Sequence, residues 1–446
     1  MAASNGPDRV LAYISWPSAP LIESLVRSAL NTVPILETTD AAPASDFNGR
    51  IVQWATYDNI DHDLIHAHPS YTLSSSYVFR KALIRKHYLS RSIYAYLVKH
   101  PESPLCAAVP RTWELEISFA DELEDMWSDE LWDLGEAMEH DSDAWWILKP
   151  GMADRGMGIR LFDNKETLQD IFEEFDDDSD EDGDRDDDDT AVVTSQLRHF
   201  VIQEYIDSPL LFDPREVPLG DREPPSVNAL EGHKFHLRVY CVASGALRVY
   251  LYRRILALFS SKPYAPPKIA DDEDGTLVDL SAHLTNTSLQ AHRGEEGVRL
   301  FDELIGCHIL SGEGAGRMLT AEHVQNIQDQ CADALAEVFR AALETPVHFQ
   351  PVPNAFELFG VDFLVSHEKS SDFQVKLLEI NAEPAIELTG PRLTWILEDL
   401  FKSIAEVAIR PFVSQQQEYA AEWKVGDTRH HLRKCLDTEI RDAASW

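Results

Sequence analysis

The chain has 446 residues, of which 44% are hydrophobic, and it carries a formal net charge of −38. So acidic a chain lacks the basic face that neutralises phosphates, which argues against direct nucleic-acid binding. Because no stretch approaches the ~20 apolar residues of a membrane helix and no signal-peptide profile opens the sequence, we expect a cytoplasmic protein without a membrane segment. A monomer is expected as well, although the sequence leaves the oligomeric state open.

The N-terminal residues predict a small α/β domain in a chain that is long enough for roughly two to four domains. Residues 10–16 form a short apolar run that is typical of a buried strand. Pro17 and Pro20 end this run, and residues 20–30 then show the apolar spacing of a helix. A second strand is predicted at 51–58. Together these segments predict an α/β unit at the start of the chain.

The next segment combines a basic helix with acidic stretches. Residues 77–99 predict a basic amphipathic helix, and residues 114–144 show helical spacing with several acids and tryptophans. Two strands are predicted at 145–150 and 158–162, around a turn that contains glycines. A further helix runs into residues 173–189, which hold 13 acids and one arginine. This composition cannot build an apolar core, so we predict a solvated insert.

The second half of the chain alternates strands with a few helices. A short Ser-Gly-Ala connection at 244–246 predicts that two of the strands form a hairpin. Helices are predicted at 319–344 and 392–409, and residues 410–446 predict a polar helical tail. The strands are predicted at 200–206, 233–244, 247–260, 356–366 and 375–387.

Lys149 closes an apolar strand and precedes a turn that contains Gly151, Gly156 and Gly158. A lysine offers a point charge to phosphate, and glycines let backbone N–H groups approach phosphate oxygens closely. Lys149 and Gly156 are therefore candidates for nucleotide binding. The turn is neither a P-loop nor a dinucleotide fingerprint, so an ordinary glycine hairpin is the alternative.

Three oxygen-bearing side chains lie on two apolar strands near the end of the sequence. Glu379 and Asn381 share one face of a strand because side chains alternate with period two. If Asp362 pairs opposite them, the three side chains converge. Hard oxygen ligands of this kind suit Mg²⁺. The alternative is that the two acids are turn or edge residues, but acids flanked by apolar residues are costly to bury without a cation.

Lys234, His236 and Arg238 alternate along one strand and therefore share a face. Arg253 follows on the partner strand. Inward-facing cations suit carboxylate and phosphate oxygens, and arginine adds bidentate geometry. A solvated basic face is the alternative. Asn286 follows an acidic loop and is a further, isolated candidate for orienting a phosphate or a metal-bound water.

Taken in order, these segments resemble the tubulin–tyrosine ligase family. The resemblance spans roughly residues 77–405 and rests on eight short blocks in one order. The blocks are FRKALIRK (79–86), WWILKPGMADRGMGI (145–159), FVIQEYIDSPLLF (200–212), KFHLRVYCVA (234–243), VYLYRR (249–254), HLTNTSLQ (283–290), FELFGVDFLV (356–365) and LLEINAEPA (377–385).

The resemblance implies an α+β ATP-grasp fold, in which two domains clasp ATP between antiparallel sheets behind a small N-terminal domain. The expected division is an N-terminal α/β domain at 1–75, a central domain at 76–196 and a C-terminal domain at 197–409. The central domain would contain a disordered acidic insert at 173–190, and a helical tail would follow at 410–446.

The resemblance also assigns roles to particular residues. ATP phosphates would contact Lys81 and Lys149, and Mg²⁺ would be held by the three oxygen donors, Asp362, Glu379 and Asn381. The adenine would lie beside Gln203 and the backbone of Glu204 and Tyr205. Phosphate, acyl-phosphate or substrate carboxylate would face Lys234, Arg238 and Arg253.

The implied activity is an ATP-dependent carboxylate–amine ligase. It would join an amino acid, with tyrosine the best guess, to a protein carboxylate, with a tubulin tail the best guess, through an acyl-phosphate. One departure stands out: the family pattern has an acid where this chain has His236. An acid there would help bind a substrate ammonium, and a largely neutral histidine does not replace it. The alternatives are ligation of another amino acid or acceptor, and a scaffold without ligase activity, for example in cytoplasmic ribonucleoprotein granules.

Overall fold

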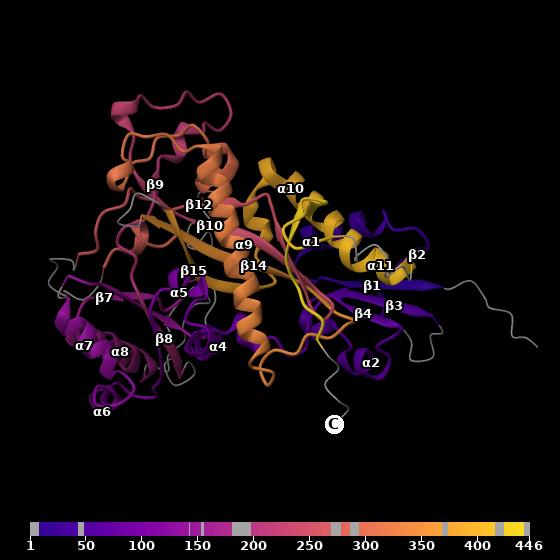
Figure 1. The fold of residues 1–446 in the computed structure, drawn as a ribbon, viewed down its shortest axis with the longest axis horizontal. Helices are drawn as coiled ribbons and strands as arrows, with labels where there is room; N and C mark the ends of the chain where they lie inside the picture. Colours follow the sequence, from indigo (N-terminus) through magenta and orange to yellow (C-terminus); the bar gives the residue numbers. More distant parts are fainter. Residues whose placement is uncertain are drawn as a thin grey trace, which may run out of the picture.

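A computed structural model describes residues 9–42, 49–141, 143–152, 156–180, 198–268, 278–285, 294–367, 373–414 and 423–440. Its strands form three sheets, of four, nine and four strands (Figure 1). Asn286 and residues 181–190 of the predicted acidic insert lie outside the described residues, and the first part of the insert, 173–180, is helical, so the prediction of disorder is wrong there. No helix among those described is both long enough and apolar enough to span a bilayer.

The N-terminal sheet is parallel and has the strand order β2-β1-β3-β4. Helix α1 begins at Pro20, whose fixed φ suits the first helical turn, and its apolar face packs on the sheet and on α10. This confirms the strand and helix predicted at the start of the chain. The elements are β1 (Val10–Ser15), α1 (Pro20–Leu30), β2 (Leu36–Thr39), β3 (Arg50–Ala55), α2 (His62–Ala67) and β4 (Thr72–Ser74).

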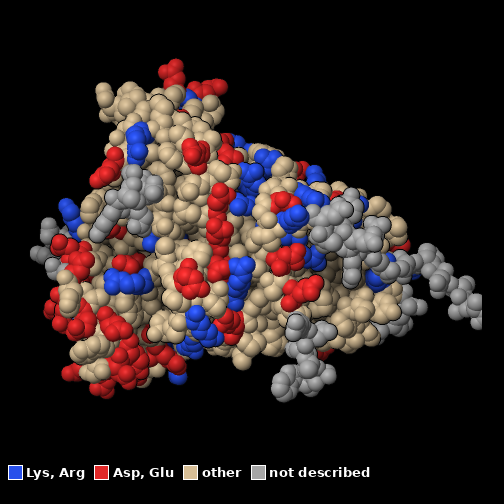
Figure 2. Space-filling view, viewed as in Figure 1, with Lys and Arg blue, Asp and Glu red and all other residues tan. Residues whose placement is uncertain are grey.

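A second sheet, in the order β5-β8-β6-β7, is antiparallel and is covered by α6, α7 and α8. The outer surface of these helices carries the dense acidic area at the lower left of Figure 2. The helices confirm much of the helical prediction for 114–144, but Thr112–Glu116 forms a strand because it pairs with β8. The elements are β5 (Thr112–Glu116), α6 (Leu123–Met126), α7 (Trp132–His140), β6 (Trp146–Pro150), β7 (Arg160–Phe162), α8 (Lys165–Asp180) and β8 (His199–Glu204).

The nine-stranded sheet is built around β10, which pairs with β11, β12 and β14. Helix α9 covers one face, while α10 and a π-helical turn (Ala405–Ile409) cover the other. The predicted hairpin at 244–246 joins β10 to β11 and is confirmed. The elements are β9 (Leu211–Phe212), β10 (His233–Ser244), β11 (Arg248–Tyr252), β12 (Leu256–Phe259), β13 (Val298–Leu300), α9 (Ala321–Leu343), β14 (Phe356–His367), β15 (Phe373–Ala382) and α10 (Thr394–Ile404).

Two predicted elements are each divided in the structure. The helix predicted at 77–99 is broken at Arg85, which has extended backbone angles, into α3 (Lys81–Ile84) and α4 (Lys86–Lys99). The single strand predicted at 247–260 becomes β11 and β12, which pair with different halves of β10. In both cases the break falls at two basic residues between apolar stretches, Arg85 and Lys86 in the first and Arg253 and Arg254 in the second, and the spacing alone did not distinguish such a break from a continuous element.

The prediction of a helical tail is wrong for most of its described part. Only α11 (Arg410–Ser414) is helical, and β16 (Thr428–Arg429) and β17 (Leu432–Asp437) follow it. Strand β17 pairs with β11 and extends the large sheet. Pairing with the edge of β11 satisfies the backbone groups of this segment and buries Leu432, Lys434 and Leu436. This tertiary contact outweighs the polar composition that suggested a surface helix.

Candidate functional site

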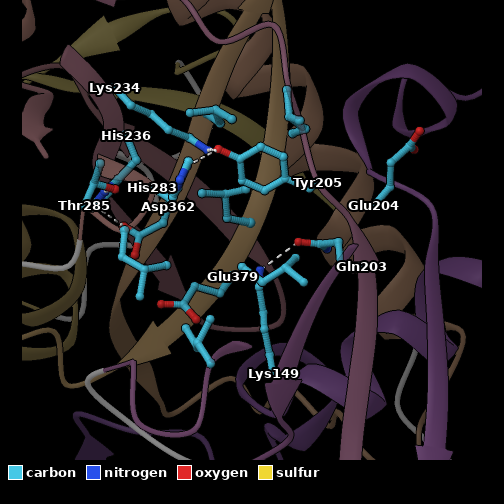
Figure 3. A pocket seen from close by; sticks show the side chains of 16 residues that line it. Lys149, Gln203, Glu204, Tyr205, Lys234, His236, His283, Thr285, Asp362 and Glu379 are labelled. Carbon is cyan, nitrogen blue, oxygen red and sulfur yellow. Dashed lines mark hydrogen bonds and ion pairs between the residues drawn. The ribbon is translucent and has the colours of Figure 1, made fainter. Parts of the chain in front are cut away.

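A cavity lies between the central sheet and the large sheet, and its polar lining comes from five strands and one loop segment (Figure 3). The strands are β6, β8, β10, β14 and β15, and the loop segment is residues 283–285. The enclosed volume is about 80 Å³. The labelled lining residues are Lys149, Gln203, Glu204, Tyr205, Lys234, His236, His283, Thr285, Asp362 and Glu379.

Two carboxylates face each other on the floor of this cavity. Asp362 on β14 is the register partner of Glu379 on β15, which confirms the predicted pairing of these strands. Asp362 is buried and Glu379 is partly buried. The Asn381 amide nitrogen donates to Glu379 Oε1 at 3.2 Å and to Asp362 Oδ2 at 3.4 Å. The three predicted oxygen-bearing side chains therefore do converge.

Cations compensate both acids. Arg238 Nε and Nη2 donate to the two Asp362 oxygens at 2.5 and 2.9 Å, and His236 Nε2 lies 3.5 Å from Oδ1. Lys86, at the start of α4, places its Nζ 3.3 Å from Glu379 Oε2. Burial alone would raise the pKa of Asp362, but the charges of Arg238 and His236 outweigh it and hold that pKa well below its usual range. Asp362 thus stays ionised inside the protein.

The side chains supply only some of the ligands that Mg²⁺ needs. Within the described ranges, no three or more His, Cys, Asp or Glu side chains are grouped to hold a metal ion. Asp362 and Glu379 nevertheless provide two carboxylates on facing strands, and Mg²⁺ is usually bound by one or two carboxylates together with water and substrate phosphate. Arg238 and Lys86 already contact these carboxylates, so a metal would have to share their oxygens.

Two buried lysines reach the same cavity from different sheets, Lys234 from β10 beside His236 and Lys149 from β6 of the central sheet (Figure 3). Lys149 Nζ donates to Gln203 Oε1 at 2.7 Å, and Lys234 Nζ donates to the Tyr205 hydroxyl at 3.0 Å. Burial lowers the pKa of Lys149 to about 8. Burial, with the charge of Lys149 as the next cause, lowers the pKa of Lys234 to about 7. Buried ammonium groups bonded to neutral partners are prepared to receive an anion.

A loop segment is tied across the cavity by two hydrogen bonds to histidine rings. The His283 Nδ1 atom lies 2.8 Å from the Tyr205 hydroxyl. The Thr285 Oγ1 atom lies 2.5 Å from His236 Nδ1. Burial, then the charge of Lys234, lowers the pKa of His283 to about 4. The segment therefore connects Tyr205, which follows β8, with His236 on β10, beside Lys234.

Most of the predicted site residues are brought together, but some are not. Glu204 lines the cavity through its main chain, because its carboxylate points away and pairs with Arg111 at 3.1 Å (Figure 3). Lys81 is exposed at the start of α3, away from the lining. Arg253 is also exposed, and it bonds two glutamines of α9 instead.

Gly156 lies beyond the cavity lining, in the turn between β6 and β7, where its φ of 80° favours glycine. The sequence reasoning missed Lys86, His283 and Thr285. Lys86 lies in the same basic block as Lys81. The sequence showed its positive charge but not that its side chain reaches Glu379. His283 and Thr285 both shortly precede the predicted Asn286. Their polar side chains, next to a candidate ligand, were the signal that could have identified them.

Comparisons with known proteins identify the family of the chain. The sequence model of the tubulin-tyrosine ligase family matches residues 65–417. A "probable tubulin–tyrosine ligase" of Schizosaccharomyces pombe is 36% identical over 420 residues, covering 90% of this chain and 92% of the relative. The "probable tubulin–tyrosine ligase PBY1" of Saccharomyces cerevisiae is 35% identical over 422 residues. This match covers 90% of the chain but only 52% of the yeast protein, so the chain spans about half of that relative's length.

A solved structure carries the same architecture. It is the crystal structure of the C-terminal domain of K. lactis Pby1, described as an ATP-grasp enzyme that interacts with the mRNA decapping enzyme Dcp2. The similarity has a TM-score of 0.65 at 28% sequence identity, and it covers 97% of this chain and 100% of that domain. The predicted α+β ATP-grasp fold is confirmed. The chain belongs to the tubulin–tyrosine ligase family and has the scaffold of an ATP-dependent ligase.

Proposed function

We propose that the cavity binds ATP with Mg²⁺ and that the chain ligates an amino acid to a protein carboxylate. One observation carries this proposal: the Asp362–Glu379 pair and the buried lysines Lys149 and Lys234 line one cavity between two sheets. The lysines supply positive charge for phosphate oxygens, and the acids supply oxygens for a metal. Tyrosine and a tubulin tail are the best candidates for the amino acid and the acceptor.

Each side of the cavity would serve one part of the nucleotide. The main chain at Glu204 and Tyr205, beside Gln203, would receive the adenine, because β8 presents its end there. The phosphates would replace Gln203 Oε1 and the Tyr205 hydroxyl as partners of Lys149 and Lys234. Bound Mg²⁺ would neutralise phosphate charge, held by Asp362 and Glu379 with the Asn381 side-chain oxygen after its amide turns.

The reaction would proceed in two displacements. The acceptor carboxylate attacks the γ-phosphorus of ATP, ADP leaves, and an acyl-phosphate forms. The amine of the amino acid then attacks the acyl carbon, phosphate leaves, and the amine loses a proton. The protein's part is to position the reactants and to neutralise charge, and Arg238 is the cation placed to face the developing phosphate or carboxylate once Asp362 takes on a metal.

The position of His236 bears on the choice of amino acid. Its ring is buried between Asp362 and Thr285, so the place of the family's acid is filled by a group without a fixed negative charge. An ammonium would gain less there than beside a carboxylate. Ligation by this family scaffold is therefore better supported than tyrosine as the particular amino acid.

Nucleotide binding would also require the cavity to open. The enclosed volume of about 80 Å³ holds a few water molecules, whereas ligand pockets usually measure ~300 Å³ or more. The bonds of His283 and Thr285 are the contacts that close the cavity toward the loop. We expect ATP to displace them, with the loop moving away from the two lysines.

Phosphate release provides the deciding test. Purified protein is incubated with MgATP and each amino acid in turn, with detyrosinated tubulin present or absent. The proposal predicts release that requires both an amino acid and an acceptor carboxylate, and that is lost in Glu379→Gln. Thermal stabilisation by MgATP, measured in parallel, reports nucleotide binding even when the right acceptor is missing. The absence of both thermal stabilisation and phosphate release at millimolar ATP would contradict the proposal.

A second candidate, a protein-binding scaffold, is favoured by the description of K. lactis Pby1 as an enzyme that interacts with Dcp2. In that case the chain would bind a decapping-enzyme partner through its surface, with or without ligation. A binding assay with a Dcp2 protein distinguishes the two functions. Binding that is equal in wild type and Glu379→Gln, combined with no phosphate release, would favour the scaffold.

A further inference from the structure

The ring of His236 carries a buried nitrogen atom without a hydrogen bond. The residue is only 2% exposed, and its ring lies in the wall of the nucleotide cavity. Nδ1 lies 2.5 Å from Thr285 Oγ1, but Nε2 has no hydrogen-bond partner among the described residues. Because buried polar atoms are almost always paired in native proteins, an orphaned nitrogen at the wall of a site points to a ligand.

Nε2 faces the carboxylate of Asp362 at a distance too long for a hydrogen bond. Figure 3 shows the two side chains next to each other, and Nε2 lies 3.5 Å from Oδ1. By contrast, His308 Nδ1 and Glu216 Oε1, a partly buried pair away from the cavity, lie 2.6 Å apart. Two atoms that each bind one ion at ~2.1 Å are roughly 3.0 to 3.4 Å apart at octahedral or tetrahedral angles, which is close to the distance at His236.

The oxygen of Asp362 beside His236 can accept one more partner. Each carboxylate oxygen offers about two lone pairs. Oδ1 accepts one hydrogen bond from Arg238 Nε at 2.5 Å, whereas Oδ2 accepts bonds from Arg238 Nη2 and from the Asn381 amide. Oδ1 therefore keeps one acceptor position, and the neighbouring His236 Nε2 does not fill it with a hydrogen bond. A cation between the two atoms would use both.

Thr285 gives the imidazole ring the orientation that a metal ligand needs. Histidines that bind metals almost always use their other ring nitrogen in a hydrogen bond, which fixes the tautomer and the direction of the ring. A proton on His236 Nδ1, donated to Thr285 Oγ1, leaves the lone pair of Nε2 toward Asp362. When the loop moves to admit ATP, a water molecule can take the place of the threonine hydroxyl.

We propose that His236 Nε2 is a ligand of the metal ion held by Asp362, and that this nitrogen makes the site prefer a transition metal such as Mn²⁺ to Mg²⁺. The inference rests on the proposed function, because this metal is the one that would accompany ATP. The acid of the family pattern would offer an oxygen at this place, and Mg²⁺ is bound through oxygen. Imidazole instead favours transition metals, and Mn²⁺ among them suits the carboxylate, water and phosphate oxygens that would complete the site.

Titration of the full chain with Mn²⁺, without nucleotide, tests this proposal by electron paramagnetic resonance. The signal reports free Mn²⁺, and nitrogen modulation of the bound signal reports a coordinated imidazole. We expect Mn²⁺ to bind about tenfold more tightly than Mg²⁺, which is measured by competition. Repeating the titration with ATP supplies the phosphate ligands.

Variants at one position separate the two nitrogens of the ring. His236→Asn keeps an amide near the place of Nδ1, for Thr285, but has no donor at the place of Nε2. It should weaken Mn²⁺ binding about tenfold or more and abolish the nitrogen modulation, with little change for Mg²⁺. His236→Asp, which offers oxygen, should shift the preference toward Mg²⁺. His308→Asn is the matched control, because His308 pairs with Glu216 outside the cavity lining.

The outcomes distinguish this inference from the proposed function. Nitrogen modulation in wild type and His308→Asn but not in His236→Asn supports the inference. Bound Mn²⁺ without nitrogen modulation, equal Mn²⁺ affinity in wild type and folded His236→Asn, or no Mn²⁺ binding at millimolar concentration with ATP present overturns it. If MgATP still stabilises the protein in that case, only the role of His236 is lost. If MgATP gives neither stabilisation nor phosphate release, the proposed function itself fails.

Discussion

Asp362 and Glu379 lie directly opposite each other on antiparallel strands, and Asn381 donates a hydrogen bond to both. Two carboxylates in this position are stable only with cations, here Arg238 and Lys86. Glu379→Gln removes one charge and should weaken MgATP binding at least tenfold, or by ~1.4 kcal/mol. Isothermal calorimetry measures this change. Glu387→Gln, at an exposed position a few residues further on, should leave affinity unchanged, and equal affinities in both variants would contradict the assignment.

Lys86 and Lys81 form a matched pair of lysines on neighbouring helices, and they give opposite expectations. Lys86 contacts Glu379, whereas Lys81 is exposed and outside the cavity lining. We expect Lys86→Gln to change MgATP affinity several-fold or more and Lys81→Gln to change it less than twofold. Thermal stabilisation at a series of ATP concentrations gives both values. A larger effect of Lys81→Gln than of Lys86→Gln would instead support the family-based expectation that Lys81 contacts the ATP phosphates.

The buried lysines predict a pH dependence of nucleotide binding. Because burial lowers the pKa of Lys234 to about 7 and that of Lys149 to about 8, both lose their protons as pH rises from 7 to 9. A phosphate prefers the charged lysines, so binding above these values must take up protons. ATP affinity should therefore fall toward pH 9, by up to about tenfold per pH unit for each proton taken up.

Calorimetry in two buffers of different ionisation enthalpy measures this proton uptake directly. Lys234→Met should remove part of the pH dependence as well as some affinity. The same shifts affect folding in the opposite sense: since the unfolded lysines bind protons up to pH ~10 and the native ones do not, stability should rise with pH across this window. Proton uptake of zero at pH 8.5 would rule out this account of the lysines.

His236→Asp tests what the buried histidine does. A carboxylate at this place would lie beside Asp362 and lose the bond to Thr285, so without metal the variant should be less stable by about 1–3 kcal/mol. Mg²⁺ should restore stability, and tyrosine-dependent phosphate release should rise if an ammonium site is regained. His236→Asn is the uncharged control. Unchanged turnover with tyrosine would refute a role of this position in amino-acid binding.

Much of the site could be predicted because burial restricts which polar residues a strand can carry. Asp362, Glu379 and Asn381 lie among apolar strand residues, and such acids need a cation or metal partner nearby. Lys149 was found in the same way, at the end of an apolar run before a glycine turn. Strand periodicity and the cost of burying a charge were sufficient to identify these residues from the sequence.

Other residues depended on geometry that local patterns do not encode. Whether Lys81 or Lys86 reaches Glu379 is decided by the extended backbone at Arg85, which ends one helix and begins another. Arg253 was expected to continue a strand, but the chain turns there and its N–H donates to the His431 carbonyl. The strand nature of 428–437 likewise depends on β11, a partner far away in the sequence.

The pairing of β17 with β11 also has a consequence for biosynthesis. Tyr252 is translated long before Leu432, its partner, so the edge of β11 stays uncovered while the intervening chain is made. Uncovered strand edges recruit other chains, and contacts between distant residues form slowly. Newly made molecules should therefore depend on chaperones until this pairing forms, and weakening β17 should lower the yield of folded protein more than it affects the molecules that have folded.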